Sequence, residues 1–169
     1  MRRRMAAMAL AGGILMGTNP LWAADVELTT RVSGIVEEVL VKPGQRVRKG
    51  AVLLRIERTV LQAHLDEAAA EQLRAQADEA DAKRELERAQ ELYNRTVSST
   101  SELEAATLRH ERTKAALTVA GARRTIAHKN LVDAELRAPF DGVVKAVPGG
   151  PGTVVTADCQ PRPLVVMSR

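Results

Sequence analysis

The three histidines are the first residues to consider for catalysis, and their spacing argues against it. His64, His110 and His128 lie far apart along a stretch of helix-forming residues. No Ser/His/Asp arrangement and no metal-ligand spacing accompanies them. The lone cysteine, Cys159, excludes an intrachain disulfide and a multi-cysteine zinc site, and it is interpreted as a free thiol in a loop. The sequence therefore predicts a protein that is not an enzyme and that holds no metal or cofactor.

Three other residues have side chains suited to docking against another protein. Arg88, Leu92 and Ser99 lie near the middle of the helix-forming stretch. An arginine can make bidentate contacts with carboxylates or carbonyls, a leucine offers an apolar anchor, and a serine can cap a helix or hydrogen-bond across a contact. The alternative is that Arg88 is a solvated charge, Leu92 packs beside a helix interface and Ser99 only forms a turn.

Two long helices are expected to position these residues. The stretch 59–134 contains no proline and one glycine, and it is rich in Ala, Glu, Arg, Leu and Gln, which favour helices. A cluster of Ser and Thr at 96–101 interrupts the pattern. The sequence therefore predicts one helix at 59–97 and a second at 101–134, each about 35 residues or roughly 50 Å long.

Both helices repeat their interface residues at alternating spacings of three and four, which is typical of a coiled coil. The expected interface positions are Leu61, Leu65, Ala68, Gln72, Ala75, Glu79, Ala82, Leu86, Ala89 and Tyr93 in the first helix, and Leu103, Ala106, His110, Thr113, Leu117, Ala120, Arg124, Ala127, Leu131 and Ala134 in the second. The alanines predict a close approach of two antiparallel helices, and the polar members are expected to set the register. Ser101 followed by Glu104 predicts a capping box at the start of the second helix.

The segments 26–58 and 135–169 carry β-strand signals on either side of the helices, and they resemble each other. Each has a glycine, a second glycine ten residues later and a valine three residues after that. The matched positions are Gly34, Gly44, Val47 and Gly50 in the first segment and Gly142, Gly152, Val155 and Asp158 in the second, with Pro139 as a further turn residue ahead of Gly142. Because neither segment can bury its own face, we expect the two to form one small β sandwich with the helices inserted between them.

This pattern is similar to that of the HlyD-type membrane fusion proteins, the periplasmic adaptors of tripartite efflux pumps. The segments Ser33–Glu57 and Leu136–Val144 resemble the two halves of that family's biotinyl-lipoyl-like domain. Adaptors that dock on a TolC-like outer-membrane channel carry an Arg, a Leu four residues on and a Ser seven residues after that. Arg88, Leu92 and Ser99 match this spacing without a gap.

The resemblance implies an α+β fold, in which a long antiparallel coiled-coil hairpin is inserted between the halves of a biotinyl-lipoyl-like sandwich. It also implies a non-enzymatic adaptor that links an inner-membrane transporter, of the RND class by the hairpin length, to a TolC-like channel and that self-assembles into a ring. The family's β-barrel and membrane-proximal domains are expected to be missing. A truncated fragment and a generic coiled-coil interaction protein therefore stay open as alternatives.

A biotin or lipoyl carrier is a further alternative, because such carriers share this kind of sandwich. They present a modified lysine at a tight hairpin between the two halves, and here the helical stretch occupies that place. The nearest lysine, Lys42, precedes Pro43-Gly44 within the first half and lacks the usual flanking Met or Asp.

Residues 1–24 predict an export signal, in which Arg2, Arg3 and Arg4 precede an apolar run. Cleavage is expected near Ala23 or Ala24, with an uncleaved anchor as the alternative, so the rest of the chain is expected in the periplasm. The formal charge of +4 owes three charges to those arginines, and aromatic residues make up only 2%. A nucleic-acid partner is therefore not expected.

Overall fold

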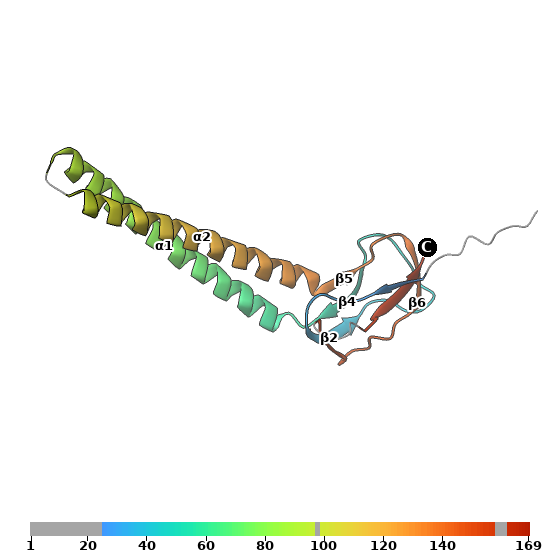
Figure 1. Cartoon of the computed structure of the whole chain (residues 1–169). Coiled ribbons are helices and arrows are strands. Elements are labelled where there is room, and N and C mark those ends of the chain that lie inside the picture. The colour runs from blue at the N-terminus through green and yellow to red at the C-terminus, as the bar shows by residue number, and fades with distance from the viewer. Residues whose placement is uncertain (1–24, 97–98, 158–161) are drawn as a thin grey trace, which may run out of the picture.

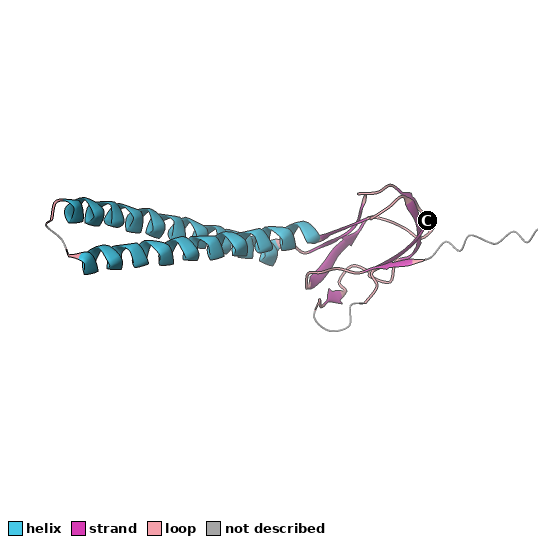
Figure 2. Cartoon of the chain, turned by 45° about the horizontal axis from the view of Figure 1, so that its top comes forward, coloured by secondary structure: helices cyan, strands magenta, loops and turns pink. Residues whose placement is uncertain are grey.

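The computed structural model describes residues 25–96, 99–157 and 162–169, and it has a helical hairpin that projects from a small body of β-strands (Figure 1). In chain order the elements are β1 (Val26–Leu28), β2 (Gly34–Val39), β3 (Arg46–Val47), β4 (Val52–Ile56), α1 (Thr59–Asn94), α2 (Thr100–Asp133), β5 (Glu135–Arg137), β6 (Gly142–Ala146), β7 (Val154–Val155) and β8 (Val165–Ser168). The strands gather at one end of the molecule and the two helices run together away from them (Figure 2). The predicted α+β fold is confirmed. The expected export signal, Asp158 and Cys159 lie outside the described residues.

The strands form two antiparallel four-stranded sheets, with the orders β1-β8-β6-β3 and β5-β4-β2-β7. In the first sheet the inner strands, β8 and β6, follow the helices in the chain, whereas the outer strands, β1 and β3, precede them. The second sheet reverses this arrangement, with β4 and β2 inside and β5 and β7 outside. Each half of the chain thus contributes the inner pair of one sheet and the outer pair of the other, so neither half can complete a sheet alone.

The residues matched in the sequence repeat meet across the two halves. Gly34 in β2 is paired with Val155 in β7, and Gly142 in β6 is paired with Val47 in β3. A Cβ atom at Gly34 would lie 2.5 Å from Cγ2 of Ile56, and one at Gly142 would fall inside the van der Waals contact of a neighbouring backbone oxygen. The first glycine of each half is therefore required for the strands to pack this closely, and the predicted repeat is confirmed.

The second glycine of each half forms an equivalent turn. Gly44 donates its backbone N–H to the carbonyl of Val144 at 2.7 Å, and Gly152 donates to the carbonyl of Val36 at 2.8 Å. Both glycines have a positive φ, 85° and 82°, a conformation that residues with a Cβ adopt at an energetic cost. The third turn glycine of the first half, Gly50, also has a φ of 85°, whereas the predicted turn residue Pro139 lies exposed between β5 and β6.

The hydrophobic core lies between the two sheets and draws on both halves. Its most deeply buried large side chains are Leu53, Leu54, Ile56, Leu164, Met167, Val36, Val144 and Val165. Val36 and Val144 occupy equivalent places two residues after the first glycine of each half, and both are fully buried. The core is aliphatic, which explains how a chain with so few aromatic residues closes a sandwich.

The predicted coiled-coil interface between α1 and α2 is confirmed almost throughout. All of its positions are buried or half-buried except Tyr93 and Arg124, which are exposed. Arg124 nevertheless reaches across the interface, where its Nη1 donates to Oε1 of Gln72 at 3.2 Å. His110 Nε2 lies 3.0 Å from Oε1 of Glu79. The two polar positions of α1 are therefore matched with two polar positions of α2, which sets the register of the pairing.

The predicted helix ends and the predicted capping box were partly wrong. The first helix ends at Asn94 rather than residue 97, because Thr96 adopts a positive φ of 62° that a helix cannot contain. The second helix begins at Thr100, and its N-cap is Ser99 rather than Ser101. The sequence offers the spacing S-x-x-E twice in succession, and only the chain conformation at the turn selects between them.

Candidate docking site at the hairpin tip

The end of the hairpin carries a shallow groove in which two of the predicted docking residues lie together. Arg88 and Leu92 are one helical turn apart on α1, so they share one side of the helix. The groove is lined by Glu85, Arg88, Ala89, Leu92, Glu102, Ala105, Ala106 and Arg109. Its walls come from both helices, and small alanines form much of its α2 side. This shape leaves room for a protruding side chain of another protein.

Leu92 is an apolar residue that the fold leaves in contact with water. Its relative exposure is 45%, although its neighbour Ala89 at the helix interface is half-buried. Leucine side chains contribute most when they are fully buried, and burying one stabilises a contact by roughly 1.5–3 kcal/mol. An exposed leucine beside an open groove is therefore available to a partner.

Arg88 differs from most arginines of the hairpin in having no side-chain partner among the described residues. Arg74, Arg84, Arg95, Arg109 and Arg123 each form an ion pair with an acidic side chain, and Arg124 bonds to Gln72. Within the described ranges, Arg88 and Arg112 make no such contact, and both are exposed. The guanidinium of Arg88 therefore keeps all five N–H donors free for an external acceptor.

Ser99, the third predicted docking residue, has a role within the chain. Its hydroxyl accepts a hydrogen bond from the backbone N–H of Glu102 at 3.3 Å and lies 2.9 Å from the hydroxyl of Ser101. The Glu102 side chain in turn accepts from the backbone N–H of Ser99 at 3.4 Å, which completes the capping box. Ser99 thus shapes the tip by starting α2. It does not itself line the groove, but its capping partner Glu102 does.

Residues of α2 and one ion pair complete the groove, and none of these was predicted as a docking residue from the sequence. Arg109 Nη1 lies 2.6 Å from Oε2 of Glu85, which joins the two helices at the lower end of the groove. Arg123 and Glu71 form a similar pair, at 2.5 Å, farther from the tip. The charged residues of these pairs occupy positions that flank the interface of an antiparallel coiled coil, so the heptad pattern marks them as candidates for ion pairs, whereas the register between the helices decides which of them pair.

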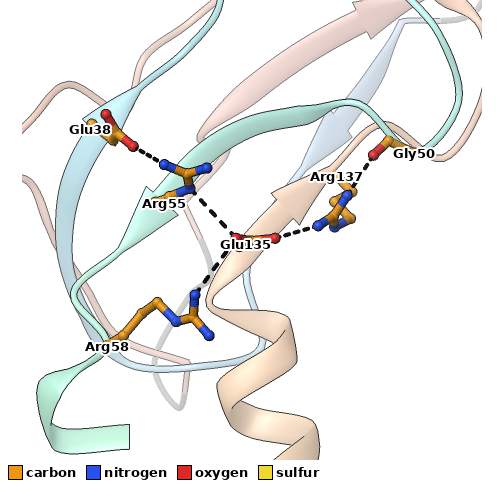
Figure 3. A network of polar contacts seen from close by, with 6 residues as sticks. All are labelled: Glu38, Gly50, Arg55, Arg58, Glu135 and Arg137. Atoms are coloured by element: carbon orange, nitrogen blue, oxygen red, sulfur yellow. Dashed lines mark hydrogen bonds and ion pairs between the residues drawn. The ribbon is translucent and has the colours of Figure 1, made fainter. Parts of the chain in front are cut away.

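The base of the hairpin is held to the sandwich by a network around Glu135 (Figure 3). Its carboxylate lies 3.5 Å from Nε of Arg55 and 3.8 Å from Nη1 of Arg58, and it also pairs with Arg137. Arg58 immediately precedes α1 and Glu135 begins β5, so the network joins the entry of one helix to the exit of the other. The backbone N–H of Ile56 adds a hydrogen bond to the carbonyl of Ala134 at 2.8 Å. The base of the hairpin is therefore bonded to β4, which precedes α1, and to β5, which follows α2.

The fold agrees with what comparison with known proteins finds. A family model described as CzcB-like, barrel-sandwich hybrid domain matches residues 24–160. The chain belongs to this family. This membership in a membrane fusion, or periplasmic adaptor, family agrees with the resemblance that Ser33–Glu57 and Leu136–Val144 show to the two halves of the biotinyl-lipoyl-like domain.

Individual relatives cover most of this chain but a smaller share of their own length. The efflux pump periplasmic linker BepF of Brucella suis is 31% identical over 142 residues, which are 84% of this chain and 34% of BepF. The uncharacterized protein YdhJ of Escherichia coli is 34% identical over 122 residues, which are 72% of this chain and 42% of YdhJ. This adaptor-family chain thus spans less than half the length of these two relatives.

A solved structure supports the same fold. The membrane fusion protein Spr0693 from Streptococcus pneumoniae has a TM-score of 0.64 and 17% identity, over 86% of this chain and 59% of that one. At this identity the likeness concerns the fold alone. Within the part of the adaptor-family chain that the structure describes, no helix is long and apolar enough to cross a membrane.

Proposed function

We propose that this chain acts as a periplasmic adaptor that connects an inner-membrane transporter of the RND class to a TolC-like outer-membrane channel, and that the hairpin tip is the end that meets the channel. The observation that carries the proposal is the pair formed by Arg88 and Leu92. One is a free guanidinium and the other is an exposed leucine, and both line one groove at the far end of a rigid arm.

The architecture gives each part of the chain a mechanical role. The 36 residues of α1 correspond to a helix about 54 Å long, so the groove is held far from the sandwich. At the channel, Leu92 would enter an apolar recess while Arg88 bonds carboxylates or carbonyls around it. A single small contact of this kind is weak, so the proposal includes several copies arranged side by side in a ring, which multiplies the contact. No chemical step is assigned to the chain.

The proposal is tested by site-directed crosslinking in cells that contain the channel. Arg88→Asp and Leu92→Asp are each expected to reduce the crosslinking yield at least tenfold and to lower resistance to exported compounds. Arg112→Asp and Leu108→Asp are matched controls, because Arg112 is also unpaired and Leu108 is 52% exposed, while both lie farther from the tip. Unchanged crosslinking in both tip variants would contradict channel docking through this groove.

A further inference from the structure

The sheet β1-β8-β6-β3 has edges of opposite charge. Its first edge strand, β1, carries Glu27 and directly follows Asp25, and both carboxylates are exposed. Its other edge strand, β3, carries Arg46 and leads into Arg48 and Lys49, which are exposed as well. One side of the sheet is therefore acidic and the opposite side is basic.

The charges at both edges have no ion-pair partner among the residues that the structure describes. None of these five side chains at the sheet edges forms an ion pair with a described residue. Ion pairs are frequent, in contrast, along the helical hairpin and at its base. Asp141 accepts a hydrogen bond from the backbone N–H of Lys49 at 2.6 Å, so it offsets part of the positive charge. The exposed Lys42, in the same turn segment, adds to that charge. The basic edge thus keeps a surplus of cations that a partner can neutralise.

The equivalent strand and turn in the other half of the chain form without such cations. Strand β7 is the equivalent of β3, since it pairs with β2 as β3 pairs with β6. The two residues of β7 and the two that follow it, which match Arg46 to Lys49, are neutral: Val154, Val155, Thr156 and Ala157. The same turn therefore forms without charge, and the basic residues of the first half are left to act on something outside the fold.

We propose that the acidic edge at β1 of one copy docks against the basic edge at β3 of the next copy. This inference rests on the proposed function, in which several copies lie side by side in a ring. It identifies the surfaces through which neighbouring copies would touch. Two different edges on opposite sides of one sheet form a head-to-tail contact, which closes into a ring or extends as a filament and does not give an isolated two-fold dimer. Strand β1 has only three residues and β3 only two, so the contact would be made mainly by side chains rather than by backbone hydrogen bonds between the two strands.

The contact is predicted to depend on salt. Exposed charge pairs are screened over about 8 Å at physiological ionic strength, so self-association should weaken as salt is added. A ring adds several such weak contacts together, which lets the assembly form although each pair contributes little.

Charge reversal tests the proposal on the full chain exported to the periplasm of a bacterial host. The variant Arg46→Glu/Arg48→Glu has two acidic edges, and the variant Asp25→Asn/Glu27→Lys has two basic edges. Each alone is expected to raise the dissociation constant for self-association at least tenfold in analytical ultracentrifugation. A one-to-one mixture is expected to assemble again, because acidic edges then meet basic ones. The control Lys83→Glu/Arg112→Glu changes the same number of exposed charges on the hairpin and is expected to assemble like the unaltered chain.

A disulfide test identifies the surfaces directly. In a Cys159→Ser background, Glu27→Cys together with Arg46→Cys is expected to give a ladder of crosslinked oligomers, whereas either cysteine alone gives no ladder. The proposal is overturned if the unaltered chain stays monomeric up to millimolar concentration, if the mixture fails to assemble, or if association proceeds equally in both reversed variants. In the last case an acidic partner protein or an anionic surface becomes the candidate for the basic edge.

The test is separate from the test of channel docking. The edge variants leave Arg88 and Leu92 unaltered, and the tip variants leave both sheet edges unaltered. A chain that assembles normally but does not crosslink to the channel contradicts the proposed docking and supports the edge contact. A chain that crosslinks to the channel without edge-dependent assembly contradicts the edge contact alone.

Discussion

Adding one methyl group at Gly142 tests how the two halves of the sandwich interlock. Gly142 begins β6, where it faces Ser168 at the end of β8 and Phe140 just ahead of it. A Cβ atom at this position would fall inside the van der Waals contact of the Ser168 carbonyl oxygen and 3.2 Å from Cε2 of Phe140. Because the oxygen belongs to the backbone, it cannot rotate away. The strands themselves would have to separate.

The magnitude follows from the size of that separation. A carbon atom and a carbonyl oxygen in contact lie about 3.3–3.6 Å apart, so β6 and β8 would have to separate by roughly 1 Å, which weakens the pairing between them. Overpacking a close-packed interior typically destabilises a protein by about 1–3 kcal/mol, and a backbone neighbour places Gly142→Ala at the upper end, about 3 kcal/mol. Gly34→Ala meets Cγ2 of Ile56 at 2.5 Å instead, a buried side chain that can yield in part, so about 1.5 kcal/mol is expected.

Gly121→Ala is the matched control, since it adds the same methyl group inside α2. The nearest atom to its Cβ would be Nε2 of Gln72 at 3.6 Å, an ordinary contact, and alanine favours a helix by about 0.5–1 kcal/mol over glycine. Urea unfolding followed by circular dichroism measures the free energies, and hydrogen exchange of the peptide containing Val144 reports on the sandwich. A free energy of unfolding for Gly142→Ala within about 0.5 kcal/mol of that of the unaltered chain would refute this account of the packing. Equal stability of Gly142→Ala and Gly121→Ala would refute it as well.

Two further predictions concern the ends of the hairpin. Ser99→Ala removes the cap of α2 and is expected to destabilise the chain by about 1 kcal/mol, whereas Ser99→Asp keeps a capping oxygen and most of the stability; equal urea midpoints for the two variants would contradict the capping role. Glu135→Gln leaves Arg55 and Arg58 facing a neutral side chain and is expected to lower the free energy of unfolding by about 2 kcal/mol. Faster hydrogen exchange at the first turn of α1 should accompany that loss, and unaltered exchange there would show that the network does not hold the helix.

Much of the hairpin could be predicted because its signals are local. Absence of proline, a three-four spacing and an interrupting Ser/Thr cluster were enough to place two antiparallel helices and nearly all of their interface. The choice between Ser99 and Ser101 as N-cap could not be made in this way, because both have a Glu three residues later. The positive φ of Thr96 ends the first helix early, and Ser99 has an extended backbone at the start of the second.

The tip could be predicted only in part. Spacing along α1 placed Arg88 and Leu92 on one side of a helix, but it contained no information about the α2 residues opposite them. The groove and the pair of Glu85 with Arg109 arise from the register between the helices. That register is set by the matched polar positions, Glu79 with His110 and Gln72 with Arg124, whose pairing emerges only when the two helices are placed side by side.

By itself, the sequence determined the long hairpin, the split of the β segments around it and the repeat of glycines that makes the two halves equivalent. Those features depend on residues a few positions apart, where backbone geometry leaves few options. Only the tertiary structure decided that each half supplies the outer strands of the other's sheet, that Glu135 joins the two ends of the hairpin, and that the acidic and basic edges lie on opposite sides of one sheet. These features depend on contacts between residues far apart in the chain, such as Val26 with Met167, which are 141 positions apart, and no local pattern specifies which strands pair.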